Sequence, residues 1–195
     1  MLKLGLFGGT FNPVHYGHLI CAERIREFCS LQKIIFVPSK RPVHKELAGA
    51  VAPEHRYRMI ELALEANPLF DVSDIEIKRK KPSFTIFTVT ELLDRHPDAD
   101  LYLIVGHDAY REIETWRDYR DLLDLVTLVV MQRTGEVSSK VNPAVKGKRV
   151  VFAENPVIEI SSTDIRNRIR QGRSTRYLLP ENVRSYIEEM GLYRA

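Results

Sequence analysis

The sequence has few of the features that mark secreted, membrane-bound or metal-binding proteins. Its two cysteines, Cys21 and Cys29, fall on or near one expected helix, too far apart along it to form a disulfide easily. No apolar run approaches the ~20 residues of a membrane span. The chain enters an apolar strand at once, with no secretory signal before it. No cluster of carboxylates suggests a dedicated metal site. These absences predict a cytoplasmic protein without a membrane segment.

The chain also lacks a strong charge of either sign. Its 29 basic and 26 acidic residues leave a net charge of +3, which is too mild to indicate nucleic-acid binding by itself. Arginines gather between Arg166 and Arg184, where a solvated helical face is the ordinary explanation. A length of 195 residues fits one domain with a full core, so we expect residues 1–195 to form a single domain. The sequence is compatible with a homo-oligomer as well as with a monomer.

Short apolar runs alternate with helical patterns along the chain. A helix between two apolar strands forms a right-handed βαβ unit in nearly every case, so the sheet should begin parallel. The pattern predicts an α/β fold, a doubly wound and mostly parallel sheet with a small C-terminal helical segment. Strands are expected at 4–7, 33–37, 70–77 (at an edge), 101–105, 126–130 and 150–153, and the main helices at 14–29, 53–67, 83–93, 161–171 and 180–190.

The first strand leads into a glycine turn and a helix that carries two histidines. Gly8 and Gly9 allow a tight turn and let another group approach the backbone closely. His15 and His18 are three residues apart in the first helical turn, so their rings can share a face. A helix start attracts phosphate, and imidazoles there can donate hydrogen bonds to it. Ordinary surface histidines are the alternative, but the glycines and the position after the first strand favour a phosphate site.

A second group of polar residues opens the helix expected at 161–171. Ser161, Ser162 and Thr163 precede Arg166, and capping alone would explain one of these hydroxyls. Together they would offer hydroxyls, backbone N–H groups and a guanidinium to phosphate oxygens. Gly106 and Asp108 follow a central strand, at the sheet edge where ligands bind in doubly wound folds. For Trp116, the only tryptophan, a core position and a stacking surface are both left open.

These motifs carry a family resemblance. Gly9-Thr10-Phe11-Asn12-Pro13 followed by His15-Tyr16-Gly17-His18 resembles the first signature of the His-x-Gly-His nucleotidyltransferases, and Ile-Ser-Ser-Thr-x-Ile-Arg at 160–166 resembles the second. Several intermediate segments are similar to the nicotinate (nicotinamide) mononucleotide adenylyltransferases, over essentially the whole chain: Pro82-Ser83-Phe84-Thr85, Gly106-x-Asp108, Thr115-Trp116, Arg133-x-Gly135 and Arg176-Tyr177-Leu178-x-Pro180. The resemblance implies the Rossmann-like nucleotidyltransferase fold.

The resemblance also implies a reaction. The phosphate of nicotinate mononucleotide would attack the α-phosphate of ATP, giving nicotinate adenine dinucleotide and pyrophosphate in NAD biosynthesis. Mg²⁺ would arrive with ATP. The implied catalytic residues are His15, His18, Lys45 and Arg166; those for ATP binding are Gly8, Gly9, Thr10, Phe11, Gly106, Asp108, Ser161, Ser162 and Thr163; those for the nicotinate mononucleotide are Thr85, Trp116 and Arg133.

Other functions are less well supported by the sequence. A related enzyme could prefer nicotinamide mononucleotide, phosphopantetheine or another phosphorylated acceptor. A dehydrogenase fits less well, because the first turn lacks Gly-x-Gly-x-x-Gly. A zinc site formed by His15, His18 and Cys21 is disfavoured, because their spacing matches no common zinc site and the sequence offers no fourth ligand. An RNA-binding module using the C-terminal arginines would bind with a steep salt dependence and release no pyrophosphate.

Overall fold

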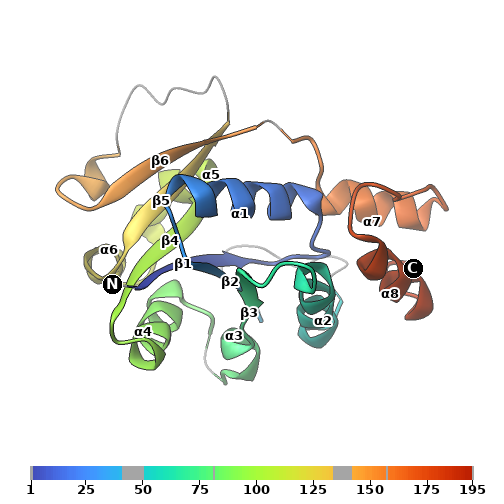
Figure 1. Ribbon diagram of the computed structural model, residues 1–195, viewed down its shortest axis with the longest axis horizontal. Helices are drawn as coiled ribbons and strands as arrows, with labels where there is room; N and C mark the ends of the chain where they lie inside the picture. The colour runs from blue at the N-terminus through green and yellow to red at the C-terminus, as the bar shows by residue number, and fades with distance from the viewer. Residues whose placement is uncertain (1, 41–50, 81, 134–141, 157, 195) are drawn as a thin grey trace.

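The computed structural model describes residues 2–40, 51–80, 82–133, 142–156 and 158–194. Within them, strands and helices alternate as the sequence pattern predicts (Figure 1). The strands are β1 (Leu2–Gly9), β2 (Lys33–Pro38), β3 (Phe70–Val72), β4 (Ala99–Gly106), β5 (Thr127–Arg133) and β6 (Val150–Asn155). The helices are α1 (Tyr16–Phe28), α2 (Pro53–Leu64), α3 (Ile75–Lys78), α4 (Thr85–Arg95), α5 (His107–Arg111), α6 (Tyr119–Leu125), α7 (Ser162–Arg170) and α8 (Glu181–Glu189), with 3₁₀ turns η1 (Ile113–Thr115) and η2 (Pro143–Val145).

The described strands form one sheet in the order β3-β2-β1-β4-β5-β6, and every neighbouring pair is parallel. The α/β, doubly wound prediction is therefore confirmed, and the sheet is parallel throughout these strands. The chain runs outward from β1 to β3, then returns to β4 on the other side of β1. This reversal creates a switch point between β1 and β4, where the loops diverge and leave a crevice for a ligand.

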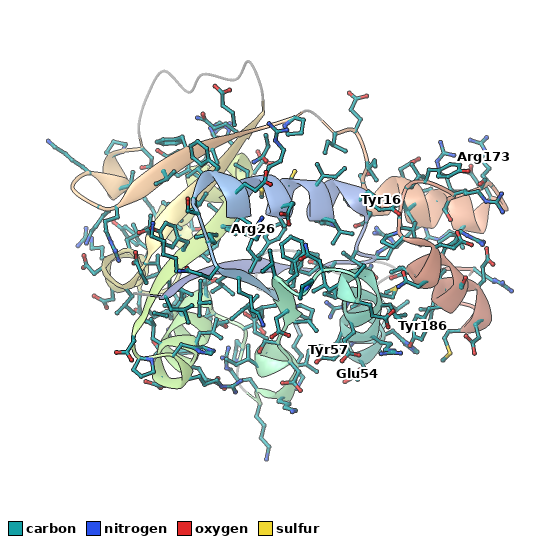
Figure 2. The ribbon with its side chains drawn as sticks, viewed as in Figure 1. Tyr16, Arg26, Glu54, Tyr57, Arg173 and Tyr186 are labelled. Carbon is teal, nitrogen blue, oxygen red and sulfur yellow. The ribbon has the colours of Figure 1, made fainter. Side chains whose placement is uncertain are left out.

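Both faces of the sheet are covered by apolar side chains. Leu4 and Leu6 of β1 lie in a cluster with α3 and α4, whereas Phe7 lies in a second cluster with α1. This alternation follows from the period of two in a strand. α7 and α8 stand beyond one end of the sheet, next to the start of α1 (Figure 1). Figure 2 shows Tyr16 at this end and Arg26 farther along the helix, so α1 runs back along the sheet from the α7 side.

One predicted element is partly wrong. The alternating segment 70–77 forms a strand only over Phe70–Val72, at the expected edge, and then turns into the short helix α3. In the β2–β3 pair, Phe36 lies opposite Val72, so a longer β3 would bring its residue 74 opposite Pro38 of β2. Proline has no N–H to continue a ladder. Ile75 is buried as the first residue of helix α3 and not as part of a strand. An alternating sequence pattern does not predict this change from strand to helix.

Candidate active site

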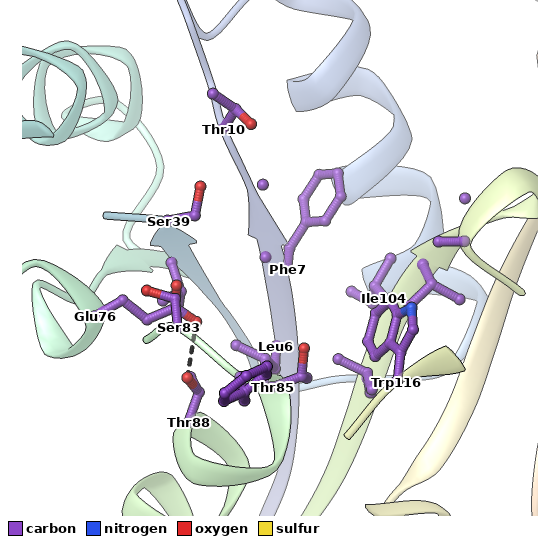
Figure 3. A pocket seen from close by; sticks show the side chains of 18 of the residues that line it. Leu6, Phe7, Thr10, Ser39, Glu76, Ser83, Thr85, Thr88, Ile104 and Trp116 are labelled. Carbon is purple, nitrogen blue, oxygen red and sulfur yellow. Dashed lines mark hydrogen bonds between the residues drawn. The ribbon is translucent and has the colours of Figure 1, made fainter. Parts of the chain in front are cut away.

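A cavity of about 530 Å³ opens at the switch point. Its walls come from the ends of β1 and β4, the start of α4, the segment after β4, and Trp116 (Figure 3). The structure thus brings together seven of the predicted site residues around one space: Gly8, Gly9, Thr10, Thr85, Gly106, Asp108 and Trp116. Trp116 is half-buried and lines this space, so it is neither a full core residue nor a free surface residue.

Two glycines leave room that the protein itself does not fill. A Cβ atom built on Gly8 or on Gly106 would meet no heavy atom within 4 Å. Packing therefore does not explain why these positions lack a side chain. Both line the cavity, and bare backbone there lets a ligand come close to the peptide groups. At Gly9 the cause is different, because a Cβ would lie 2.9 Å from the ring of Phe11.

The turn between β1 and α1 places both histidines at the start of the helix. Phe11 takes a left-handed backbone conformation, with φ of 47°, and its buried ring lies edge-on to His18 at 5.0 Å between centroids. The rings of His15 and His18 stack at 3.7 Å. The backbone N–H of His15 donates to Nδ1 of His18 over 3.3 Å. In neutral His18 the proton must then lie on Nε2, which leaves Nε2–H as its donor.

Burial favours the neutral form of both imidazoles. Burial lowers the pKa of His15 to about 4. For His18, burial and then the neighbouring His15 hold the pKa well below its usual range. Nδ1 of His15 is buried and has no hydrogen-bond partner within the described part of the chain. A buried polar atom without a partner is costly, so this atom suggests a ligand that supplies the partner. Neither His15 nor His18 is among the residues that line the 530 Å³ cavity, to which the turn itself contributes Gly8, Gly9 and Thr10.

The second signature touches the first turn directly. Arg166 Nη1 donates to the carbonyl oxygen of Asn12 at 2.9 Å, although the residues are 154 apart. Ser162 Oγ donates to the carbonyl oxygen of Pro13 at 2.8 Å, and Ser161 Oγ caps α7 by accepting from the N–H of Asp164. The two signatures therefore lie side by side in the fold. Nε of Arg166 is a second buried atom for which the described residues provide no partner.

The structure leaves some assignments as predictions. Lys45 lies outside the described residues. Arg133 is the last residue of β5, paired in register with Asn155. Thr163 is exposed, and its hydroxyl oxygen accepts from Arg166 Nη2 at 3.3 Å. Phe11 is buried, so only its backbone is available to a nucleotide. The phosphate-binding roles of Ser161, Ser162 and Thr163 follow from their motif and stay predictions.

Sequence reasoning missed a buried arginine beneath the turn. Arg56 of α2 is fully buried, and it donates to the carbonyl oxygens of Thr10 at 2.7 Å and of Ser39 at 2.6 Å. It ties the end of β1 to the end of β2. Its spacing of four and eight residues from Ile60 and Leu64 placed it on the buried face of the helix, which was the available signal.

A buried carboxyl was missed as well. Glu76 of α3 lines the cavity, and burial raises its pKa. Its Oε1 accepts a hydrogen bond from Thr88 Oγ1 at 2.7 Å, drawn in Figure 3. Arg79 Nη1 donates to the same hydroxyl oxygen at 3.0 Å. The strand predicted over 70–77 concealed this residue, because Glu76 falls on the opposite face from Ile75 and Ile77 in a period-two pattern.

Among residues 2–40, 51–80, 82–133, 142–156 and 158–194, no three His, Cys, Asp or Glu side chains gather in a way that could hold a metal ion. Across the same ranges, every helix is too short or too polar to cross a membrane.

Comparisons with known proteins agree with this geometry. The sequence profile of the cytidylyltransferase-like family matches residues 6–168. A probable nicotinate-nucleotide adenylyltransferase from Desulfitobacterium hafniense (strain Y51) is 43% identical over 98% of this chain and 96% of its own length. The relative with the same description from Geobacillus thermodenitrificans (strain NG80-2) is 42% identical over 100% of this chain and 88% of its own.

Solved structures show the same fold. Plasmodium falciparum nicotinic acid mononucleotide adenylyltransferase, solved in complex with NaAD, superposes with a TM-score of 0.79 at 18% identity and covers 99% of this chain and 98% of its own. A putative nicotinate-nucleotide adenylyltransferase from Vibrio parahaemolyticus gives 0.71 at 19% identity over 100% and 96%. The chain therefore belongs to the cytidylyltransferase-like nucleotidyltransferases and, among them, to the nicotinate-nucleotide adenylyltransferase family.

Proposed function

We propose that this chain joins ATP and nicotinate mononucleotide to give nicotinate adenine dinucleotide and pyrophosphate. A phosphate oxygen of the mononucleotide forms a bond to the α-phosphorus of ATP, and the bond from that phosphorus to the bridging oxygen of pyrophosphate breaks. The substrate supplies the nucleophile, so the protein has to position two anions and neutralise charge. The main support is that both signatures meet on one turn beside the cavity, as the Arg166–Asn12 and Ser162–Pro13 contacts record.

The turn and α7 take the triphosphate in this proposal. Backbone groups of Gly8, Gly9, Thr10 and Phe11 contact the nucleotide, and Ser161 to Thr163 bind phosphate at the start of α7. Nε2–H of His18 donates to a phosphate oxygen, and the unpartnered Nδ1 of His15 gains a partner there. Charge develops on the leaving pyrophosphate, where such donors and Arg166 are most effective. Lys45 would act with Arg166 on the outer phosphates.

The cavity takes the nucleosides. Asp108, exposed at its mouth, would accept hydrogen bonds from ribose hydroxyls beside the bare backbone of Gly106. The half-buried indole of Trp116 offers a face for the pyridine ring, and Thr85 at the start of α4 lines the same cavity (Figure 3). Arg133 is retained as a weaker candidate for the acceptor. Mg²⁺ is treated as part of the ATP substrate, bound by its phosphates. The cytoplasmic location expected from the sequence stays part of this proposal.

Pyrophosphate release tests the reaction. Purified protein with ATP and Mg²⁺ should release pyrophosphate when nicotinate mononucleotide is added, and a parallel assay with nicotinamide mononucleotide measures the preference between acid and amide. His18→Ala should lower kcat by roughly 10²–10³, the usual effect of removing one such donor. Its thermal unfolding should show that the fold is retained. Near-native turnover of His18→Ala would remove the catalytic role, and no release with either mononucleotide would refute the function.

A further inference from the structure

The last residues of the described chain contact the turn between β1 and α1. The hydroxyl of Tyr193 donates to Oδ1 of Asn12 at 2.8 Å, across 181 residues of sequence. Both side chains are buried, with exposed fractions of 6% for Tyr193 and 5% for Asn12. Tyr193 is therefore shielded from solvent and is not among the residues that line the cavity, yet it holds a residue of the first signature. The reaction proposed above does not use it.

Asn12 is a junction for several parts of the site. Its Oδ1 also accepts from the N–H of Val51, at the residue where the described chain resumes before α2. Its carbonyl oxygen accepts from Arg166 Nη1 at 2.9 Å. One residue thus meets the C-terminal segment, the segment before α2 and the guanidinium of the second signature. Movement of Asn12 would displace Arg166 and the turn that leads to His15.

The chemistry of the Tyr193 contact favours a fixed geometry. Burial raises the pKa of Tyr193, so the phenol stays protonated and donates at every working pH. Losing this donor would leave the buried Oδ1 of Asn12 with only the longer bond from the N–H of Val51, at 3.4 Å, and a group shielded from water gains no ready substitute. The hydroxyl therefore restricts the rotation of the Asn12 side chain. A fixed Asn12 side chain also restricts the backbone of Asn12, whose carbonyl oxygen accepts the hydrogen bond from Arg166.

We infer that Tyr193 is a positioning residue for adenylyl transfer, acting through Asn12 to fix the phosphate-binding turn and Arg166. The inference rests on the proposed role of that turn in holding the triphosphate. Full activity then requires that the C-terminal segment is docked on the turn. Tyr193 does not line the cavity, so its effect on the reaction is indirect. The affected step is the placement of ATP and its leaving group, and the mononucleotide pocket around Trp116 is outside its reach.

The test compares two tyrosines that both anchor the C-terminal segment. Tyr193→Phe removes only the hydroxyl that reaches Asn12. Tyr186→Phe removes a hydroxyl of α8 that is hydrogen-bonded to Nδ1 of His55 in α2 at 2.8 Å; Tyr186 is labelled in Figure 2. Tyr193→Phe should lower kcat/KM for ATP by roughly 5- to 20-fold, as expected for one buried hydrogen bond. KM for nicotinate mononucleotide should stay within about twofold of wild type. Tyr186→Phe should shift only the melting temperature.

A double-mutant cycle separates positioning from general stability. In an Asn12→Ala background the further change Tyr193→Phe should have no kinetic effect beyond about twofold, because the acceptor is already gone. Wild-type kinetics for Tyr193→Phe, or the same loss with and without Asn12, would overturn the inference. If His18→Ala keeps its turnover, the proposed site itself is wrong. If His18→Ala is inactive while Tyr193→Phe is silent, only the present inference fails.

Discussion

Gly8→Ala should separate folding from substrate binding at the switch point. A Cβ at Gly8 meets no heavy atom within 4 Å, and Gly8 has no positive φ that would strain an alanine. The added methyl group reduces the freedom of the unfolded chain and should stabilise the fold by about 0.5 kcal/mol. For a chain of this size that corresponds to a rise of roughly 1–2 °C in melting temperature.

The same methyl group should impair the reaction. It would project into the cavity at a point where we place the nucleotide against the backbone. A ligand pushed away by about 1 Å can lose roughly 100-fold in rate through misplacement alone. We therefore expect kcat/KM for ATP, measured by pyrophosphate release, to fall by about that factor while the melting temperature stays level or rises.

Gly9→Ala is the matched control, one residue away on the same strand. Its Cβ would lie 2.9 Å from the Phe11 ring, which is buried against Phe7 and Phe36. Overpacking of this kind costs about 1–3 kcal/mol, so Gly9→Ala should lower the melting temperature by roughly 3–10 °C. Wild-type kcat/KM for Gly8→Ala would show that ATP does not bind against Gly8. A large loss of stability in Gly8→Ala would show that the space over Gly8 is not open in the folded protein.

Two further predictions concern His15 and Trp116. Because the folded pKa of His15 is about 4 and the reference value is 6.5, the unfolded chain binds the proton first as the pH falls, so this contribution to stability is complete above about pH 6.5 and is lost toward pH 4. Urea unfolding should show a loss of about 2 kcal/mol from this group between pH 7 and pH 5, and a His15→Asn variant with the same pH dependence as wild type would contradict the assignment. Trp116 is the only tryptophan, so a pyridine ring stacked on it should quench the intrinsic fluorescence when nicotinate mononucleotide is titrated in, with a smaller change for ATP alone. An emission that does not respond to the mononucleotide would place the ring elsewhere.

Local sequence was sufficient for most of the architecture. The apolar run before Gly8, the glycine turn and the helical spacing after it predicted β1, the turn and α1, because each depends on residues within a few positions of one another. The edge position of the third strand was also predicted. Its length was not, since the end of β3 depends on Pro38 of the neighbouring strand and on the burial of Ile75.

The motifs determined the kind of chemistry, whereas the tertiary structure decided how the site is held. The motif predicts Ser162 as a phosphate ligand, which stays a prediction, and only the fold shows that its hydroxyl donates to the carbonyl oxygen of Pro13. Arg56 and Tyr193 carried no motif at all, yet they hold Thr10 and Asn12. These contacts join residues 46 to 181 positions apart. Periodicity and spacing describe neighbours along the chain, whereas the folded backbone sets which distant side chains meet. The motifs in the sequence therefore predicted the reaction, and only the fold showed which distant residues support the site.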